Sequence, residues 1–158
     1  MTKDIDPATA ADIEQQVENP EAFLHTCLYF TANRLSRAIT RMADDAFATT
    51  GLAPGYGYVI RLSVAKPGIT QKELSEKLYI TPSTLTRFID KLEAKQLVER
   101  KVQGKTVLVY PTDKGRELEP TIRAASKKLL ESYQAILGNE AAAQLTLSLE
   151  TTSEQLEK

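Results

Sequence analysis

The sequence predicts a mainly α-helical chain: a winged helix-turn-helix module with a small β-hairpin wing, flanked by long helices at both ends. Three observations support this fold class. Apolar residues recur every three or four positions in long stretches near both ends of the chain. In the middle, two short helical patterns follow each other across a three-residue turn. The pattern then changes to two strand-like runs joined by a glycine-containing turn.

Composition sets the first limits. The 158 residues suffice for one core, or for a small module with helical extensions. No window approaches about eighteen consecutive apolar residues, and the start is polar and acidic, so we expect no membrane span and no secretory signal. The single cysteine cannot form an internal disulfide, which favours a cytoplasmic location. With one histidine and one cysteine, we expect neither a metal nor a cofactor.

The charges are distributed unevenly, although the formal net charge is only −1. The segment from Lys66 to Arg116 holds eleven Lys and Arg against six Asp and Glu, whereas the rest of the chain has a net charge of −6. A basic middle between acidic ends indicates a partner rich in phosphate. An ordinary charged surface is the alternative.

Residues 1–50 are expected to be helical. The first eighteen form a short polar helix at best. Asn19-Pro20-Glu21 then indicates an N-cap, a proline at the first helical position and an acid in the first turn. An apolar stripe from Leu24 to Ala46, without Pro or Gly, predicts one amphipathic helix of about 28 residues that stops at Gly51.

Residues 112–158 mirror this pattern. One helix is expected from Thr112 to a break at Gly138-Asn139, and a last helix over about residues 140–156. The long helices at both ends have more apolar surface than one small core can cover. We therefore expect residues 1–50 and 112–158 to form a homodimer interface, with packing inside one chain as the alternative.

A helix over Pro54 to Ala65 opens the module, residues 51–111. Thr70 and Glu73 then have the spacing of a capping box at the start of a short helix. Thr81-Pro82 indicates a second capped helix directly after it. One face of this second helix is apolar and the other carries hydroxyl and basic side chains, which is typical of a helix-turn-helix. The apolar positions are Leu85, Phe88, Ile89 and Leu92.

Two strands are expected next, over Leu97–Val102 and Thr106–Tyr110. Gly104 is the first central residue of the turn between them, which suits a two-residue type II′ turn. A β-hairpin directly after a helix-turn-helix makes a winged helix. Each signal is weak singly, whereas the ordered set is specific.

The stretch ITQKELSEKLYITPSTLTRFIDKLEAKQLVERK, followed by VYPTDKGREL, resembles the MarR family of winged-helix transcription factors. The resemblance extends over nearly the whole chain. It implies a cytoplasmic homodimer that binds pseudo-palindromic DNA, and we expect a repressor released by a small ligand or an oxidant. Gln96 stands where the family usually has glycine, so a strained φ is expected there. The wing is shortened to Gly104-Lys105 and lacks the family's arginine at its tip.

This geometry assigns roles to exposed side chains of the module. Pro82, Ser83 and Thr84 form the first helical turn, which enters the major groove. Arg87 is the best candidate for a base contact, with a phosphate contact or a surface charge as alternatives. Thr86 and Lys91 are expected to meet phosphates. Three further residues are expected to add affinity, with a solvated surface position as the alternative for each: Lys72, Arg100 and Lys105.

The resemblance also implies an effector. A small phenolic or carboxylate ligand is expected to bind near Tyr29, Arg34, Tyr56, Tyr58 and Arg61, with core tyrosines and surface arginines as the alternative. Some family members sense hydroperoxides through a cysteine near the start of the same helix, which makes Cys27 a candidate redox residue. We favour a buried and inert thiol at Cys27.

The sequence contains no motif that supports an enzymatic function. The sequence has no Gly-x-Ser-x-Gly elbow, no Walker loop and no His-Glu-x-x-His motif, and Gly55-Tyr56-Gly57 is typical of a helix entry. We therefore expect no catalytic activity. The competing function is a winged helix that binds protein, of the anti-repressor type, without specific DNA binding. The short wing and the acidic ends favour that alternative.

Overall fold

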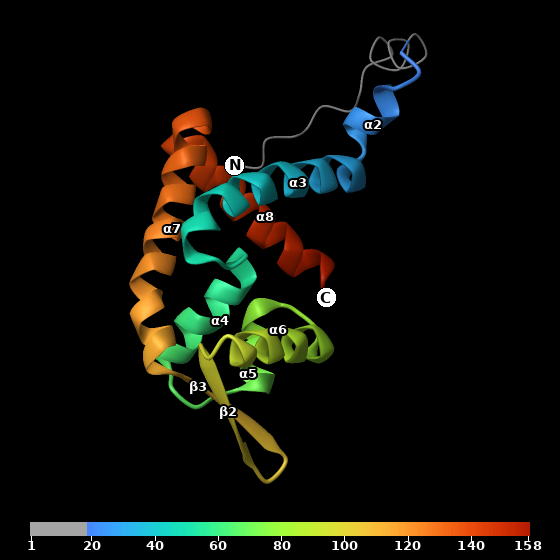
Figure 1. Cartoon of the computed structure of the whole chain (residues 1–158). Helices are drawn as coiled ribbons and strands as arrows, with labels where there is room; N and C mark the ends of the chain where they lie inside the picture. The colour runs from blue at the N-terminus through green and yellow to red at the C-terminus, as the bar shows by residue number, and fades with distance from the viewer. Residues whose placement is uncertain (1–18) are drawn as a thin grey trace. The chain divides into compact units, whose positions relative to one another are not determined.

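The computed structural model describes residues 19–158 of the chain (Figure 1). The chain forms two compact units, residues 1–41 and 42–158. The described part is mostly helical with one small sheet, and none of its helices is both long and apolar enough to cross a membrane. The helix expected within the first eighteen residues lies outside the described residues. The elements are α2 (Ala22–Thr26), α3 (Leu28–Phe47), η1 (Ala48–Thr50), α4 (Pro54–Ala65), β1 (Ile69–Thr70), α5 (Gln71–Leu78), α6 (Pro82–Ala94), β2 (Val98–Gln103), β3 (Thr106–Pro111), α7 (Asp113–Leu137) and α8 (Asn139–Leu156).

The expectation of one N-terminal helix of about 28 residues is wrong, because the helix is interrupted at Cys27. Cys27 has extended backbone angles (φ −87°, ψ 117°), which separate α2 from the twenty residues of α3. No residue of α2 is buried, and five residues are too few for a helix to persist without packing. Asn19 accepts a hydrogen bond from the backbone of Glu21 (3.0 Å) as expected of a cap, but the regular helix begins only at Ala22.

The segment from α3 to α4 follows the local signals. The 3₁₀ turn η1 ends at Gly51, which has a left-handed φ of 71° and donates its N–H to the carbonyl of Ala48. The hydroxyl of Thr50 donates to the carbonyl of Phe47 (2.7 Å) and accepts the N–H of Leu52 (3.0 Å). These bonds close the corner before α4, whose predicted bounds are confirmed.

The helix-turn-helix is confirmed with both of its caps. Thr70 Oγ1 accepts the N–H of Glu73 (3.0 Å), and the Glu73 carboxylate accepts the N–H of Thr70 (3.2 Å), which is a complete capping box for α5. Thr81 caps α6, with Pro82 in its first turn. Between the two helices Tyr79 adopts a left-handed φ of 54°, which the sequence reading did not foresee.

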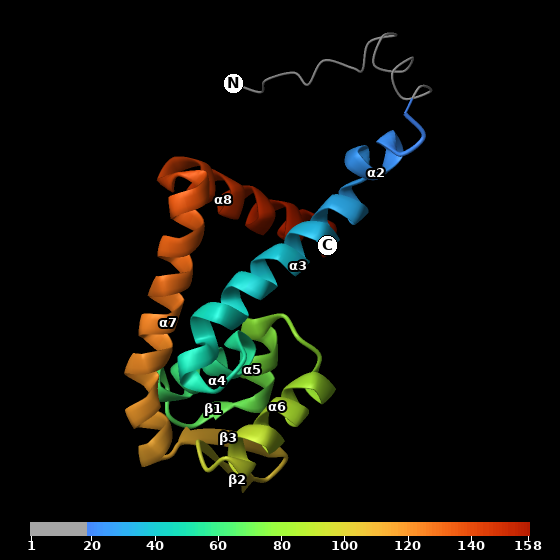
Figure 2. The same cartoon turned by 45° about the horizontal axis from the view of Figure 1, so that its top comes forward.

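The sheet has three antiparallel strands in the order β1-β3-β2, whereas only the β2–β3 hairpin was expected (Figure 2). Ile69 of β1 pairs with Val109 of β3, forty residues further along the chain. The hairpin register brings Gln103 opposite Thr106, which leaves a two-residue loop. Its first residue, Gly104, has a φ of 64°, as a type II′ turn requires.

The C-terminal helices match their predicted bounds. Thr112 caps α7, where its Oγ1 accepts the N–H of Gly115 (3.1 Å) and donates to the carbonyl of Gln96 (2.6 Å). This second bond ties the start of α7 to the turn between α6 and β2. A sharp corner at Gly138, with a φ of 86°, separates α7 from α8 (Figures 1 and 2).

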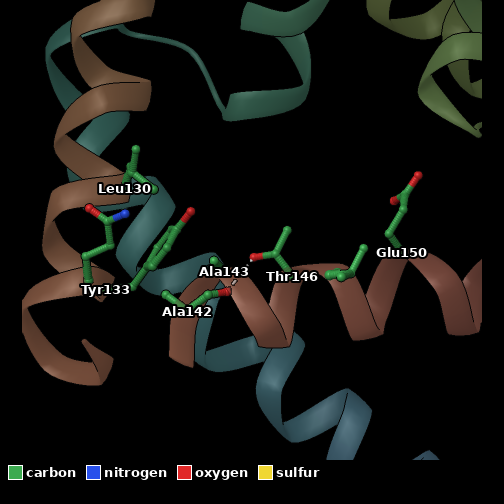
Figure 3. A pocket seen from close by; sticks show the side chains of 8 residues that line it. Leu130, Tyr133, Ala142, Ala143, Thr146 and Glu150 are labelled. Atoms are coloured by element: carbon green, nitrogen blue, oxygen red, sulfur yellow. Dashed lines mark hydrogen bonds between the residues drawn. The ribbon is translucent and has the colours of Figure 1, made fainter. Parts of the chain in front are cut away.

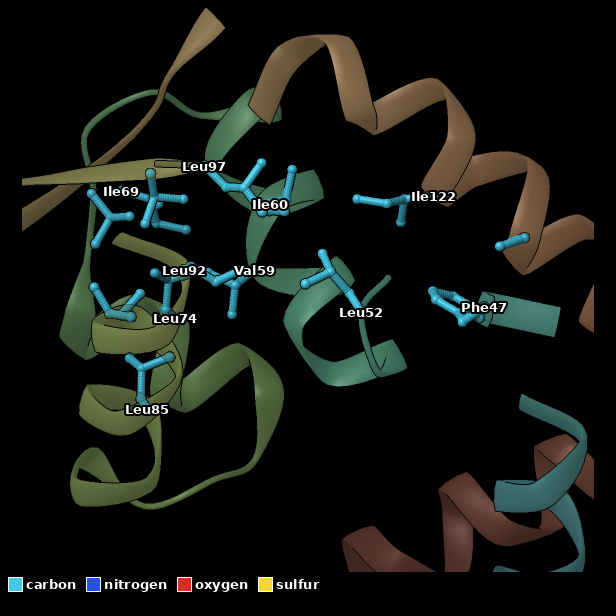
Figure 4. Close-up of a cluster of buried hydrophobic side chains, with 14 of the residues drawn as sticks. Phe47, Leu52, Val59, Ile60, Ile69, Leu74, Leu85, Leu92, Leu97 and Ile122 are labelled. Carbon is cyan, nitrogen blue, oxygen red and sulfur yellow. The ribbon is translucent and has the colours of Figure 1, made fainter. Parts of the chain in front are cut away.

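A single hydrophobic core holds the unit of residues 42–158 together (Figure 4). It joins helices α4, α5 and α6 to the sheet and to the first half of α7. Fully buried side chains reach it from every one of these elements, and burial of each contributes roughly 1.5–3 kcal/mol of transfer free energy. They include Phe47, Val59, Ile60, Ile69, Leu74, Leu85, Ile89, Leu92, Val109 and Ile122.

The end of α7 beyond Leu129 and the whole of α8 lie outside this core. They enclose a mainly apolar cavity of about 500 Å³, in which Tyr133 and Leu130 of α7 face Ala142 and Thr146 of α8 (Figure 3). Ala142 is the only buried residue of α8. The remaining apolar side chains of this helix pair are largely exposed, namely Ile136, Leu137, Leu145, Leu147, Leu149 and Leu156.

Candidate nucleic-acid interface

The first turn of α6 is ordered by a hydroxyl cluster. Thr81 Oγ1 accepts the N–H of Thr84 (3.2 Å), donates to Thr84 Oγ1 (2.9 Å) and lies 3.1 Å from Ser83 Oγ. Pro82 and Ser83 are exposed and Thr84 is half-buried. The start of the helix therefore presents a proline ring and two hydroxyl groups on a capped turn.

The rest of α6 divides into a buried and an exposed face. Leu85, Ile89 and Leu92 are fully buried in the core. Arg87 is exposed, and its guanidinium donates a long hydrogen bond to Thr84 Oγ1 (3.4 Å). The hydroxyl of Thr86 donates to the backbone carbonyl of Pro82 (2.9 Å). Arg87 is thus anchored by a rigid helix while its charged group stays in solvent.

An aromatic stack fixes α4 against α6. The rings of Tyr56 and Phe88 lie 4.4 Å apart and nearly parallel, and the Lys91 ammonium is 4.9 Å from the centre of the Tyr56 ring. A side chain at Gly55 would place its Cβ 3.0 Å from the Phe88 ring, so the small residue lets the two helices approach closely. Tyr56 therefore packs on α6, and its ring holds Lys91 by a cation–π contact.

Arg100 joins the wing to α6. Its backbone N–H and its guanidinium both donate to the Glu93 carboxylate, at 3.0 and 3.1 Å, and the guanidinium also pairs with Asp90. Two hydrogen bonds lower the pKa of Glu93: the one from the Arg100 side chain has the larger effect, and the one from the Arg100 backbone N–H has the smaller. The bond to Glu93 raises the pKa of Arg100. Sequence reasoning had named Arg100 but neither of its partners.

The two remaining predicted basic contacts lie at separate places. Lys72 is exposed near the start of α5, beside a cavity of about 170 Å³ that Pro82 and Leu85 also line. Lys105 is exposed at the tip of the hairpin. Lys72 therefore lies close to the start of α6, whereas Lys105 extends the basic surface along the wing.

The residues proposed for an effector belong to both units of the chain, three to residues 42–158 and two to residues 1–41. Tyr58 and Arg61 line a cleft of about 370 Å³ together with Lys77 of α5, which the sequence reading missed. Tyr56 is absent from that lining and packs on Phe88 instead. Two more members lie on α3 within the unit of residues 1–41, and both are exposed: Tyr29 and Arg34.

Cys27 is exposed, so the expectation of a buried thiol is wrong. Cys27 lies in the extended link between α2 and α3, where no residue of α2 is buried and the next residues of α3, Leu28 and Tyr29, are exposed as well. His25 contacts the ring of Phe30 edge-on at 6.5 Å. Within residues 19–158, no three His, Cys, Asp or Glu side chains lie together as metal ligands would.

Two residues carry backbone strain at the junctions of the module. Gln96, between α6 and β2, has a φ of 61°, which confirms the strain expected from the missing glycine. Tyr79 has a φ of 54° between α5 and α6. Left-handed conformations of this kind disfavour residues with a Cβ. Tyr79 lies between two capped helices, and Gln96 lies between α6 and the buried start of β2, so the packed elements on either side hold both turns in place.

The elements and their order define a winged helix-turn-helix protein: a capped second helix with an exposed polar face, followed by a β-hairpin on the same core. The model of the MarR family matches residues 59–102, which confirms the resemblance to this family predicted from the motifs. The chain is also 29% identical over 93 residues to YybA of Bacillus subtilis (strain 168), described as an uncharacterized HTH-type transcriptional regulator. That match spans 56% of this chain and 61% of the relative.

Solved structures share the fold. The transcriptional repressor CouR, known from Rhodococcus jostii RHA1, bound to a 23-mer DNA duplex has a TM-score of 0.75 at 23% identity, over 84% of this chain and 96% of that chain. CouR bound to p-coumaroyl-CoA has a TM-score of 0.76 at 23% identity, over 83% and 94% of the two chains. MepR of S. aureus in a DNA complex has a TM-score of 0.71 at 19% identity, over 82% and 98%.

Proposed function

We propose that this chain is a sequence-specific DNA-binding transcriptional regulator, a repressor that binds a pseudo-palindromic operator as a homodimer. The observation that carries the proposal is α6, which buries Leu85, Ile89 and Leu92 in the core while its capped first turn and Arg87 face solvent. The net charge of +5 between Lys66 and Arg116 favours a phosphate-rich partner. The DNA complexes of CouR and MepR, which share this fold, give further support.

The proposed contacts follow the geometry of α6. Its first turn enters the major groove, and Arg87 donates two hydrogen bonds to a guanine. Thr86 and Lys91 contact phosphates on either side. Lys91 would exchange its contact with the Tyr56 ring for a phosphate oxygen. The first-turn residues are Pro82, Ser83 and Thr84, and the residues that add affinity are Lys72 and Lys105.

The apolar side chains at the end of the chain support the proposed dimer. Leu147 is 60% exposed and Leu156 is 72% exposed, and the cavity between α7 and α8 is open to a partner. A second copy that packs around the α7–α8 pair would bury them. We expect Leu147→Glu to shift the protein from dimer to monomer in light scattering after gel filtration, whereas Gln144→Glu, which adds the same charge at an exposed position of α8 outside the cavity lining, should leave the dimer intact. A wild-type protein that is monomeric at all concentrations would contradict the dimer.

We propose a small phenolic or carboxylate effector as the releasing signal, because a CouR structure holds p-coumaroyl-CoA. Tyr58 and Arg61, in the cleft with Lys77, are the candidate residues of the larger unit. Tyr29 and Arg34 are the candidates on α3. The exposed thiol of Cys27 is the candidate for an oxidant. An effector releases DNA only if it binds the DNA-free state more tightly.

Fluorescence anisotropy on the upstream intergenic DNA of the protein's own gene tests the proposal, with a scrambled duplex as reference. We expect a Kd of about 10⁻⁸ M or tighter, and a preference of roughly 10³ or more over the scrambled duplex. Affinity should also fall steeply with salt, because phosphate contacts release counterions. Equal and weak binding to both duplexes would favour the protein-binding alternative over DNA recognition.

Arg87→Ala tests the assignment of the recognition helix. Loss of a bidentate contact to guanine should cost roughly 1–3 kcal/mol and relax the preference at one base pair. Lys128→Ala, an exposed basic residue on α7, is the matched control and should bind like the wild type. Wild-type affinity in Arg87→Ala would remove this residue from the interface.

A further inference from the structure

Arg100 of β2 ties the wing to α6 by hydrogen bonds and an ion pair. Its backbone N–H donates to one oxygen of the Glu93 carboxylate (3.0 Å), and its guanidinium donates to the other oxygen (3.1 Å). The same guanidinium nitrogen pairs with Asp90, which lies three residues before Glu93 and therefore on the same face of α6. The backbone N–H of Arg100 thus contacts the Glu93 carboxylate, and its guanidinium contacts the carboxylates of both Glu93 and Asp90.

Because Arg100 lies near the base of the hairpin, a small change of angle at Arg100 displaces the hairpin tip. Arg100 pairs with Val109 in the sheet, and every residue from Lys101 to Thr106 is exposed. The outer hairpin is therefore not held by burial. The turn that holds Lys105 begins after Gln103, three residues or about 10 Å along the strand from Arg100, so a tilt of about 15° at Arg100 would move the tip by about 3 Å. Such a shift exceeds what a hydrogen bond to a phosphate tolerates.

The charges around Arg100 argue against a direct phosphate contact. One guanidinium faces two carboxylates, so the cluster of Asp90, Glu93 and Arg100 has a net charge of −1. The Arg100 side chain is only 26% exposed, and its guanidinium is already occupied by these carboxylates. A phosphate approaching this cluster would meet net negative charge.

We propose that Arg100 is a positioning residue: it fixes the direction of the wing relative to α6, so that Lys105 and Arg87 meet the same segment of DNA, and it does not bind phosphate itself. The inference rests on the proposed function and adds a role for Glu93 and Asp90 that the exposed basic side chains do not suggest. In this arrangement two acidic residues beside the interface strengthen DNA binding, because they hold Arg100 in place.

Glu93→Met separates positioning from simple electrostatics, because the two predict opposite signs. Removal of a negative charge beside DNA should tighten binding if charge alone matters. If Glu93 holds the wing, the same change should weaken DNA binding by about tenfold, because Lys105 is no longer held in position to contact its phosphate. Glu93→Gln keeps one acceptor oxygen and should recover part of the loss. The matched control is Glu99→Met, the exposed acid next to Arg100 on β2, whose side chain points to the other face of the sheet.

The full set is measured by anisotropy on the operator duplex, with Arg100→Met and the double variant Glu93→Met/Arg100→Met included. We expect each single variant to lose about tenfold in affinity and the double variant to lose about tenfold as well, because both substitutions break the same contact. Glu99→Met should bind as well as the wild type or better. Tighter binding by Glu93→Met, or losses that multiply to about a hundredfold in the double variant, would overturn the proposal.

Hydrogen exchange in the absence of DNA gives an independent readout. The Arg100 amide should exchange about tenfold faster in Glu93→Met, because its acceptor is gone, while its exchange in Glu99→Met stays at the wild-type rate. An unchanged Arg100 amide in Glu93→Met would overturn the positioning role. If the wild type binds no duplex specifically, the proposed function fails, and the exchange experiment still decides whether Glu93 holds the wing.

Discussion

The helix-turn-helix and the C-terminal helix α8 use the same apolar residue in opposite ways. Leu74, Leu85 and Leu92 are fully buried, whereas Leu147 and Leu156 are 60% and 72% exposed. Leu145, Leu149 and Leu156 of α8 recur at helical spacing and are exposed, so helical spacing does not explain the difference. The module contains a facing surface for each of its leucines, and α8 does not. The comparison teaches that the module is complete within one chain, while α8 has an apolar face that fits the proposed dimer.

The two regions also differ in how their helices begin. A threonine side chain caps each of α5, α6 and α7, and α5 has a full capping box. In contrast α8 begins at Gly138 and α2 after Glu21, neither with a side-chain cap. Capping contributes about 1 kcal/mol per helix, so α5, α6 and α7 are specified locally as well as by packing, whereas the core helix α4 starts at Pro54 without a side-chain cap. The helices without caps depend more on what packs against them.

The largest expected effect comes from the core of the module. Leu85→Ala should lower the free energy of unfolding by about 2–5 kcal/mol, because it leaves a cavity among fully buried side chains. Leu147→Ala removes the same atoms from an exposed position and should cost at most about 0.5 kcal/mol within one chain. Urea unfolding at low protein concentration, where any dimer dissociates, measures both. Equal costs would contradict the contrast between the two regions.

The next effect concerns Gly115 in the first turn of α7. A Cβ there would lie 2.2 Å from the carbonyl oxygen of Leu97, although Gly→Ala within a helix normally stabilises by up to about 1 kcal/mol. We expect Gly115→Ala to destabilise by about 2 kcal/mol or more, because backbone must move. Arg116→Ala, the exposed neighbour, serves as control and should change thermal stability little. A more stable Gly115→Ala protein would show that α7 is not held against the module at this point.

A smaller, stabilising effect is expected at Gln96. Its φ of 61° is costly for a residue with a Cβ, and glycine adopts it freely. Gln96→Gly should therefore raise the free energy of unfolding by up to about 1 kcal/mol, even though glycine also gains entropy in the unfolded chain. Lys95→Gly, at an ordinary φ of −83°, should not stabilise. Thermal unfolding of both variants at one concentration decides whether the strain is real.

The smallest effect is the pH dependence of the α5 cap. The Lys66 ammonium and then the Thr70 N–H donate to Glu73, and both hold its pKa below the ordinary value of 4.5. A pKa lowered by folding means that the ionised carboxylate stabilises the folded state above pH 4.5, and that this contribution disappears as the pH falls through the lowered value. Glu73→Gln should thus melt below the wild type at pH 7 and together with it at strongly acidic pH. Glu76→Gln on the same helix should follow the wild type at both.

The predictable parts of the molecule are those with a local chemical signal. The capping box, the proline after Thr81 and the turn at Gly104 were all predicted from neighbouring residues. The same holds for the stop at Gly51. At the interface, Arg87 was placed on the exposed face because the apolar spacing of α6 left no other place for it. These features depend on interactions between residues about four positions apart or fewer, so they can be predicted from the sequence alone.

The interruption at Cys27 and the third strand had no such signal. No proline or glycine marks the break, and β1 consists of only two residues, which pair with β3 forty positions away. Two further contacts had no local signal because they join different elements: Tyr56 of α4 stacks on Phe88 of α6, and Arg100 of β2 donates to Glu93 of α6. A reading of the sequence could name Tyr56 and Arg100 as functional candidates, but it could not tell what they contact.

By itself the sequence determined the class of the protein, the bounds of most helices and the exposed face of α6. Capping, turn geometry and helical periodicity act over a few neighbouring residues, so they can be read without coordinates. Only the tertiary structure decided which partner each side chain meets: that Tyr56 packs on α6, that two carboxylates hold Arg100, and that Cys27 is exposed. Such contacts join residues distant in the chain, and they exist only once packing has brought the elements together.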